Sequence, residues 1–128
     1  MPLAPTIADL TYLPEYVNGR KFEKWLYQGR LHSVDDRPAK IVNDGEELHW
    51  YTHGLRHRDG APAIIYANGK QVWYHLNEIH NANGPAKIFL DGEEQYYLHG
   101  QRYESIRDWL KDNPCKTEKL VMMKMKYL

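Results

Sequence analysis

Seven histidines are the residues of this chain best suited to metal binding or proton transfer. His49, His53 and His57 follow one another at intervals of four residues, a spacing that would place metal ligands in one stripe on a helix. However, Trp50-Tyr51 favours a strand and Gly54 favours a turn. On a strand His49 and His53 would share a face but lie about 13 Å apart, at roughly 3.3 Å per residue. We therefore expect no metal site.

Acidic pairs and the single cysteine, Cys115, give no support for catalysis. The pairs are Asp35-Asp36, Glu46-Glu47 and Glu93-Glu94. They flank expected turns, where carboxylates are solvated and diverge, whereas general acid–base chemistry needs convergent, partly buried groups. No residue of the sequence is identified as a base for Cys115. Glycine-rich phosphate loops, G-x-S-x-G and C-x-x-C are absent from the sequence. We expect no catalytic residue, no cofactor and no enzymatic activity.

Three of the histidines belong to a tandem repeat with a period of about 23 residues. Each unit has an aromatic pair, a glycine or asparagine four residues after the first ring, a histidine three residues later, a Pro-Ala step and an Asp-Gly or Asn-Gly pair. The pairs are Trp50-Tyr51, Trp73-Tyr74 and Tyr96-Tyr97, with Trp25-Leu26 at the first equivalent place; the histidines are His32, His57 and His80, with Tyr103 in the next equivalent place; the Pro-Ala steps are Pro38-Ala39, Pro62-Ala63 and Pro85-Ala86. Chance does not align so many landmarks three times.

The glycine-containing pairs predict β-hairpins. Asp44-Gly45, Asn68-Gly69 and Asp91-Gly92 could supply the two positive-φ residues of a type I′ turn. The flanking segments are rich in β-branched and aromatic residues, which is typical of strands. The glycine, or Asn77, that follows each aromatic pair is expected to take a second tight turn.

Alternation along the expected strands predicts which face is buried. The alanine of each Pro-Ala step and the isoleucine two residues after it share one face, and Lys40, Ile64 and Lys87 share the other. We expect the Ala/Ile face to be buried. Its isoleucines are Ile41, Ile65 and Ile88. We also expect the repeated histidines to form a structural ladder in which each ring bonds the loop of its own unit.

The predicted fold is mainly β, a meander or solenoid of tandem antiparallel β-hairpin repeats with two short C-terminal capping helices, in a single domain over residues 1–128. Residues 1–15 form an N-terminal arm, 16–103 the repeat array and 104–128 the helical cap. Ser105 is typical of a helix N-cap, and Asn113-Pro114 ends that helix. A second helix is expected from about residue 118 to 127. The helices should cover the last strand edge.

Composition excludes several classes of protein. Lys and Arg balance Asp and Glu at 17 each, so nothing indicates DNA or RNA binding, which usually requires a basic excess. One cysteine rules out a disulfide-stapled secreted scaffold. The chain contains no apolar run of membrane-spanning length and begins without a signal-peptide pattern. We expect a soluble, cytoplasmic protein that makes no membrane contact.

One surface is left over by these structural assignments. Four tyrosines lie close to the same register and are interleaved with histidines and arginines, a mixture suited to a protein partner or to a nucleotide-like ligand. The predicted binding residues are Tyr27, Tyr51, His53, Arg56, Arg58, Tyr74, His75, Tyr97, His99 and Arg102. The competing interpretation is that the rings merely cover the sheet.

The unit W-Y-x-x-G-x-x-H-x-x-x-G-P-A resembles MORN-type repeats in a variant form. Within that family it is similar to the W-Y-x-N-G-x-x-H-R-x-D-G-P-A proteins of bacteriophages, giant viruses and some bacteria, over roughly residues 16–103. Asn77 replaces a glycine, and Arg37 and Ala61 disturb the G-P-A step. The resemblance implies a hairpin array used for binding, without catalytic residues common to the family.

This resemblance implies a phage or viral protein that binds and inhibits a host protein, plausibly of a defence system, in the host cytoplasm. One alternative is a sponge that sequesters a nucleotide signal, in which case a homo-oligomer is expected. Another is an antitoxin-like partner of a co-encoded toxin, because bacterial relatives are often described as antitoxin components. Eukaryotic members are linked to membranes or protein scaffolds.

Overall fold

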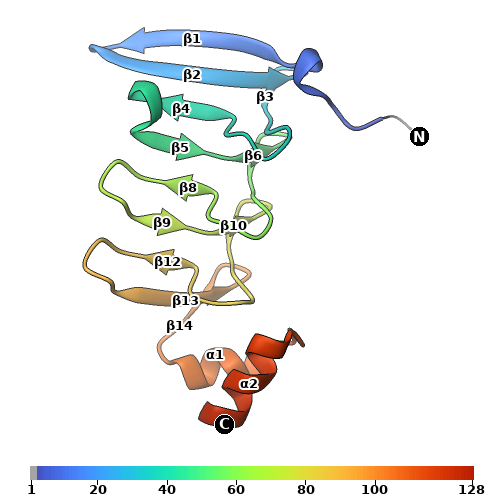
Figure 1. Ribbon diagram of the computed structural model, residues 1–128, viewed down its shortest axis with the longest axis vertical. Helices are drawn as coiled ribbons and strands as arrows, with labels where there is room; N and C mark the ends of the chain where they lie inside the picture. Colours follow the sequence, from blue (N-terminus) through green and yellow to red (C-terminus); the bar gives the residue numbers. More distant parts are fainter. Residues whose placement is uncertain (1–2) are drawn as a thin grey trace.

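A stack of β-hairpins forms the body of the protein in the computed structural model, which describes residues 3–128 (Figure 1). The main antiparallel sheet has the order β1-β2-β4-β5-β8-β9-β12-β13-β14, with β3 paired to β2. Its strands are β1 (Thr11–Val17), β2 (Arg20–Tyr27), β3 (Arg30–Leu31), β4 (Lys40–Val42), β5 (Glu47–His49), β8 (Ile64–Ile65), β9 (Gln71–Val72), β12 (Lys87–Ile88), β13 (Glu94–Leu98) and β14 (Gln101–Tyr103). The predicted class, a meander of antiparallel hairpins, is confirmed.

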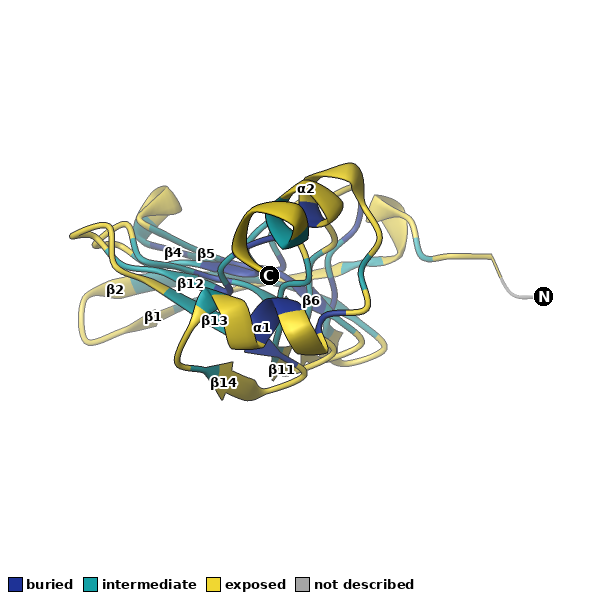
Figure 2. Ribbon diagram, turned by 90° about the horizontal axis from the view of Figure 1, so that it is seen from below, coloured by how far each residue is buried: buried dark blue, intermediate teal, exposed yellow. Residues whose placement is uncertain are grey.

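Each unit continues into a small second hairpin. Two of these are separate two-stranded sheets, β6 with β7 and β10 with β11. Their bounds are β6 (Tyr51–Thr52), β7 (Leu55–Arg56), β10 (Tyr74–His75) and β11 (Glu78–Ile79). Seen along the stack, β11 and β14 turn to one side of the main strands (Figure 2). The chain therefore has two kinds of turn per unit, one at each end of the hairpin.

The type I′ turns lie mainly at the end opposite to the one predicted. His53-Gly54, Leu76-Asn77 and His99-Gly100 each join strands through two residues that both have positive φ. In contrast, Asn68-Gly69 belongs to a three-residue loop: Tyr66 N–H bonds Lys70 O, and only Gly69 has positive φ. The loop of Asp91-Gly92 is closed in the same way, and Asp44-Gly45 lies in the longer loop that contains η2 (Asn43–Gly45).

Those Asn and Asp side chains explain the difference in turn type. Asn68 Oδ1 accepts from Lys70 N–H and Asp91 Oδ1 accepts from Glu93 N–H, each at 2.9 Å. Such Asx bonds hold the preceding residues in a right-handed turn, so glycine alone needs the left-handed conformation. The prediction of a hairpin at these positions is right, and the prediction of a type I′ turn there is wrong.

In the short strands the isoleucines of the predicted face are less buried than expected, and residues of the other face are more buried. Val42, Ile64 and Val72 are at most 2% exposed, and strand register places them on the face that also carries Lys40 and Lys87. Ile41, Ile65 and Ile88 are only half-buried. Long cationic side chains lie against aromatic rings on the face of Val42, and we attribute the burial of its aliphatic residues to this layer.

Alanine in each Pro-Ala step is fully buried, as predicted. Ala39, Ala63 and Ala86 are 0% exposed. Their carbonyls accept the backbone N–H of Trp25, Trp50 and Trp73, each at 2.8 Å. The step therefore connects the start of one hairpin to the aromatic pair of the neighbouring strand.

The N-terminal boundary differs from the prediction. Residues 11–15, assigned to the arm, pair with β2 in the strand β1, which extends the array to Thr11. Pro14 fits because it lies in an edge strand, where one side needs no ladder hydrogen bond. Ahead of it, η1 (Ile7–Asp9) begins at Thr6, whose side chain and backbone form a capping box with Asp9.

Two helices cap the other end, as predicted: α1 (Ile106–Asp112) and α2 (Glu118–Tyr127). Ser105 Oγ accepts from Asp108 N–H at the start of α1. Trp109, Leu110 and Leu120 are 0% exposed and pack on Leu98 of the last hairpin. The helices η1 and α2 lie on the same side of the sheet, opposite to β11 and β14 (Figure 2). Among the described residues, no helix is long and apolar enough to cross a membrane.

Candidate functional site: two faces of the array

The repeated histidines form a ladder that links consecutive units. His32 Nδ1 accepts the backbone N–H of His53 at 3.0 Å, and His80 Nδ1 accepts that of His99 at 2.9 Å. His57 Nδ1 likewise accepts the N–H of Leu76 at 3.1 Å. Each donor is the first residue of the next unit's type I′ turn. The structural ladder is present, but the Nδ1 bonds join each ring to the following unit. The predicted bond to the loop of the ring's own unit is found for His57, which contacts Asp59, and not for His32 or His80 among the described residues.

Ladder geometry fixes the protonation state of these rings. An Nδ1 that accepts a hydrogen bond carries no proton, so the neutral ring holds its proton on Nε2. In His57 that Nε2 donates to Asp59 Oδ1 at 3.0 Å. Burial lowers the pKa of His32, and the nearby His53 lowers it further. Burial also lowers the pKa of His80. These rings therefore act as neutral hydrogen-bond acceptors.

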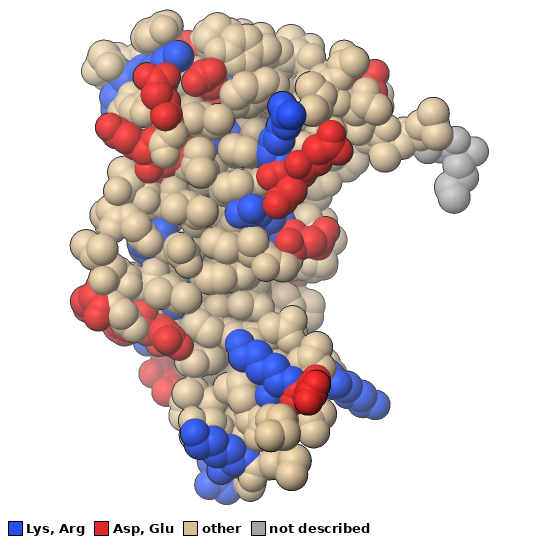
Figure 3. All heavy atoms as spheres, in the orientation of Figure 1, with Lys and Arg blue, Asp and Glu red and all other residues tan. Residues whose placement is uncertain are grey.

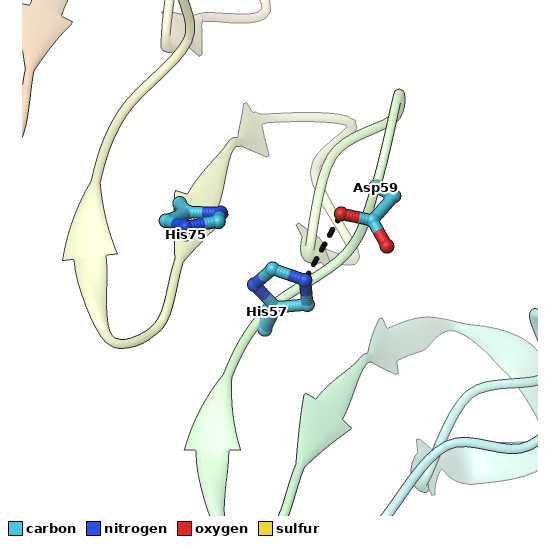
Figure 4. A group of neighbouring side chains, drawn as sticks. All are labelled: His57, Asp59 and His75. Carbon is cyan, nitrogen blue, oxygen red and sulfur yellow. Dashed lines mark hydrogen bonds and ion pairs between the residues drawn. The ribbon is translucent and has the colours of Figure 1, made fainter. Parts of the chain in front are cut away.

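One group of side chains has the spacing of a metal site. Ligand atoms of His57, Asp59 and His75 lie within 4.8 Å of one another, with His75 contributed by the next hairpin (Figure 4). A histidine that binds a metal through Nε2 must carry its remaining proton on Nδ1. In His57 that Nδ1 faces the N–H of Leu76. The geometry supports a hydrogen-bonded pair of His57 and Asp59 more than a metal centre.

The surface predicted as one binding face is divided between two faces of the sheet. We call the face that carries Val42 and Ile64 the tyrosine face, and the opposite one, which η1 and α2 overlie, the histidine face. Tyr51, Tyr74, Tyr97, Arg56 and Arg102 belong to the tyrosine face by alternation and pairing. Arg102 and Tyr97 are direct cross-strand neighbours.

The other five predicted binding residues lie elsewhere. Tyr27 is one residue out of register with the other tyrosines, and its ring packs on His32 and His53. His75 packs in the same way between His57 and His80. His53 and His99 are the first residues of type I′ turns, and Arg58 lies on the histidine face.

Cations lie against aromatic rings along the tyrosine face. The Arg56 guanidinium is 5.6 Å from the Tyr74 ring centre, and Lys87 Nζ is 5.2 Å from that of Tyr97. Lys70 Nζ lies 4.8 Å from the Phe89 ring. At the N-terminal end, Lys40 Nζ lies 5.6 Å from the Phe22 ring. Within residues 3–128, no carboxylate lies within 4.0 Å of Lys40, Arg56, Lys70 or Lys87.

The centre of this face has an excess of positive charge. Burial, with Lys40 and Arg56 nearby, lowers the pKa of His49 to about 4. Glu47 is the nearest acid, with Oε1 3.7 Å from His49 Nε2, and it does not offset this effect. Burial and neighbouring cations also lower the pKa of Lys40. His49 Nδ1 and Arg56 Nε are buried without a hydrogen-bond partner among the described residues.

Sequence reasoning missed several residues of the tyrosine face. They are Lys40, His49, Tyr66, Lys70 and Lys87. Lys40 and Lys87 were placed on the presumed outer face, and His49 was considered only as a metal ligand. Had the strand register been known, the alternation of side chains from Tyr51 back along β5 and across to β4 would have placed His49 and Lys40 on this face.

On the histidine face each unit has a shallow hollow beside its tryptophan. In the second unit Arg58 covers Trp50, with the guanidinium carbon 3.7 Å from the ring centre. Asp36 of the preceding loop holds Arg58 through two hydrogen bonds, of 2.9 and 3.0 Å. In the view of Figure 3, acidic and basic side chains lie side by side in the middle of the array, and basic side chains gather at the helical end. This face is therefore internally paired in charge.

Comparison of the chain with protein-family models, with curated proteins and with solved structures found no match.

Proposed function

We propose that the protein is a non-enzymatic binding module whose tyrosine face docks on an acidic surface of a protein partner. The observation that carries this proposal is the row of four cations that lie against aromatic rings without an acid. They are Lys40, Arg56, Lys70 and Lys87. Unpaired cations held over rings are ready to pair with carboxylates from outside, since their side chains are already ordered.

The residue types of this face favour a protein partner. Tyrosine and arginine are the residues that most often dominate binding energy at protein interfaces. Tyr51 and Tyr97 are 9% exposed, so they serve as a rigid floor, and the cations above them supply the contacts. The resemblance to viral and phage repeat proteins supports a host protein, such as a component of a defence system, as the partner.

A charge-reversal experiment tests the proposal. Tagged protein is used to capture and cross-link partners from host-cell extract, and the captured protein is identified and its affinity measured. The double variant Arg56→Glu/Lys87→Glu should bind at least about 30-fold more weakly, the loss of a hot spot of about 2 kcal/mol. Equal capture by this variant and the wild type would refute the assignment of the face.

The matched control carries the same change of charge on another surface. Arg107→Glu/Lys111→Glu alters two exposed residues of α1 and should bind the partner as the wild type does. If this control also loses binding, the interaction depends on total charge and not on the tyrosine face.

A nucleotide-like ligand is the second candidate, because the Arg56 guanidinium over the Tyr74 ring could hold a phosphate beside a stacking surface. Calorimetry with a panel of cyclic nucleotides separates the two. A protein-binding module should give no heat with any of them, whereas a sponge should bind one tightly and lose it in Tyr74→Ala.

A further inference from the structure

The row of rings on the histidine face is covered at every position except one. The row consists of Trp25, Trp50, Trp73 and Tyr96. Tyr12 packs on Trp25 with ring centres 5.2 Å apart, and Trp109 packs on Tyr96 at 4.9 Å. Arg58 covers Trp50, which is 4% exposed. Among the described residues, no ring or guanidinium lies against Trp73, which is half-buried, as Trp25 and Tyr96 are.

The sequence of the third unit explains why Trp73 is open. The residue after the ladder histidine is Arg58 in the second unit and Asn81 in the third. Arg58 Nη1 donates to Pro62 O, and Asn81 Nδ2 donates to Pro85 O in the equivalent way. Asparagine keeps this one contact but is too short to cross the tryptophan ring. A hollow of about 470 Å³ lies in its place, and Trp73, Asp59 and His75 line it together with Asn81.

The carboxylate that would complete the arrangement is also present. Asp36 comes from the loop that precedes the unit of Arg58, and Asp59 comes from the loop that precedes the unit of Asn81. The Asp59 side chain is 93% exposed and is bonded only to His57 Nε2 among the described residues. A ring nitrogen of His75 lies within 4.8 Å of a carboxylate oxygen of Asp59, and the His75 ring has no hydrogen bond to any described residue.

We propose that the hollow over Trp73 accepts an arginine side chain of a protein partner, which stacks on Trp73 and pairs with Asp59 as Arg58 does with Trp50 and Asp36. A planar guanidinium suits both requirements, since it stacks on an aromatic face and bonds a carboxylate with two donors. A lysine ammonium can pair with the carboxylate, but it is not planar and does not stack on the ring in the same way. The site lies on the face opposite to the tyrosine face and is independent of the function proposed above.

Three charged side chains line the hollow, those of Arg58, Asp59 and Lys119. Arg58 is neutralised by its bonds to Asp36. Lys119 of α2 is the charge that opposes binding of a cation, because it lines the same hollow, close to Gly84. Removal of this lysine should therefore tighten binding, which gives the proposal a test with the opposite sign.

Nuclear magnetic resonance of the indole N–H groups tests the site with N-acetyl-arginine amide as the probe. Trp73→Phe identifies the Trp73 signal. We expect a saturable shift of Trp73, with Trp50 unchanged and a dissociation constant in the millimolar range that suits one side chain. N-acetyl-citrulline amide, which is planar but uncharged, should bind about tenfold more weakly, the loss of a charged hydrogen bond.

Three variants complete the test. Asp59→Asn should weaken binding of the arginine probe about tenfold, and Lys119→Ala should tighten it. Asn81→Arg should abolish binding, because it supplies from within the chain the side chain that the hollow is proposed to take, and it should raise the melting temperature. Absence of a saturable shift at tens of millimolar probe, or equal binding of the arginine and citrulline probes, would overturn the proposal.

Discussion

The tyrosine face and the histidine face are built from the same repeat but treat their charges in opposite ways. On the histidine face Arg58 is bonded to Asp36 and His57 is bonded to Asp59. On the tyrosine face Arg56 and Lys87 lie over rings and have no acid within 4.0 Å among the described residues. On the histidine face these charged groups are bonded within the repeat array, whereas the two cations of the tyrosine face are the ones that we propose contact a partner. The predictions below test this division.

The largest expected effect on stability is that of pH through His49. Its pKa is about 4 in the folded protein and about 6.5 in an unfolded chain. Between these pH values the unfolded chain binds more protons than the folded protein does. The stability that the neutral His49 ring contributes is therefore fully present above pH 6.5 and is lost as the pH falls to 4. The loss from this ring is roughly 3 kcal/mol. Denaturant unfolding at pH 7 and at pH 4 measures it.

The variant His49→Gln isolates that contribution. Its stability should fall less between pH 7 and pH 4 than that of the wild type, with the remaining fall due to the ladder histidines His32 and His80, whose pKa values are also lowered by burial. An unchanged pH dependence in this variant would assign the effect to the histidine face alone.

The ladder should be the next most sensitive element. His80→Ala removes the acceptor of the His99 N–H and should destabilise the protein by about 2 kcal/mol. His75→Ala removes an exposed ring without a hydrogen bond and should cost less than about 0.5 kcal/mol. Chemical denaturation of both variants provides the comparison. Equal losses would show that the rings act by packing and not as acceptors.

Arg58→Lys is expected to destabilise the protein by about 1 kcal/mol, because lysine keeps the charge but loses the two-donor bond to Asp36 and the stacking on Trp50. Asp36 should then show a higher pKa, since the hydrogen bond to Arg58 is what lowers it. Thermal unfolding and NMR titration of the Asp36 carboxyl measure the two effects. An unchanged melting temperature would mean that the guanidinium over Trp50 does not stabilise the fold.

Lys87→Ala should have the smallest effect on stability, below about 0.5 kcal/mol, because it removes one cation–π contact at a partly exposed site. Binding of the proposed partner should fall nevertheless. A variant that lost stability but kept binding would reverse the roles assigned to the two faces.

Sequence reasoning captured what repeats and local chemistry determine. The hairpin array, the buried alanines and both capping helices follow from spacing, turn residues and the N-cap at Ser105. The type of each turn was harder to predict from the sequence, because the Asx bonds of Asn68 and Asp91 compete with a type I′ turn. Which of the two forms depends on how the flanking strands pair.

The candidate site was harder to predict for a related reason. A shift of one residue moves a side chain to the other face of a sheet, and Tyr27 is shifted in this way relative to Tyr51. Neither can the partner of each ladder histidine be read from its own unit, because the bond crosses to the next one. The pairing register between the strands of neighbouring units could not be predicted from the sequence.

The ladder also gives the array a direction and an end. Each of the three ladder histidines contacts the turn of the following unit. At the next equivalent place Tyr103 donates instead to Asp112 of α1 at 2.9 Å, which joins the last unit to the helical cap. A block such as residues 50–72 thus carries both an acceptor, His57, for the turn of the following block and a turn, at His53, for the histidine of the preceding one. Duplication or deletion of such a cassette would lengthen or shorten the molecule without a change at either end, so repeat number is a variable on which evolution or an engineer can act.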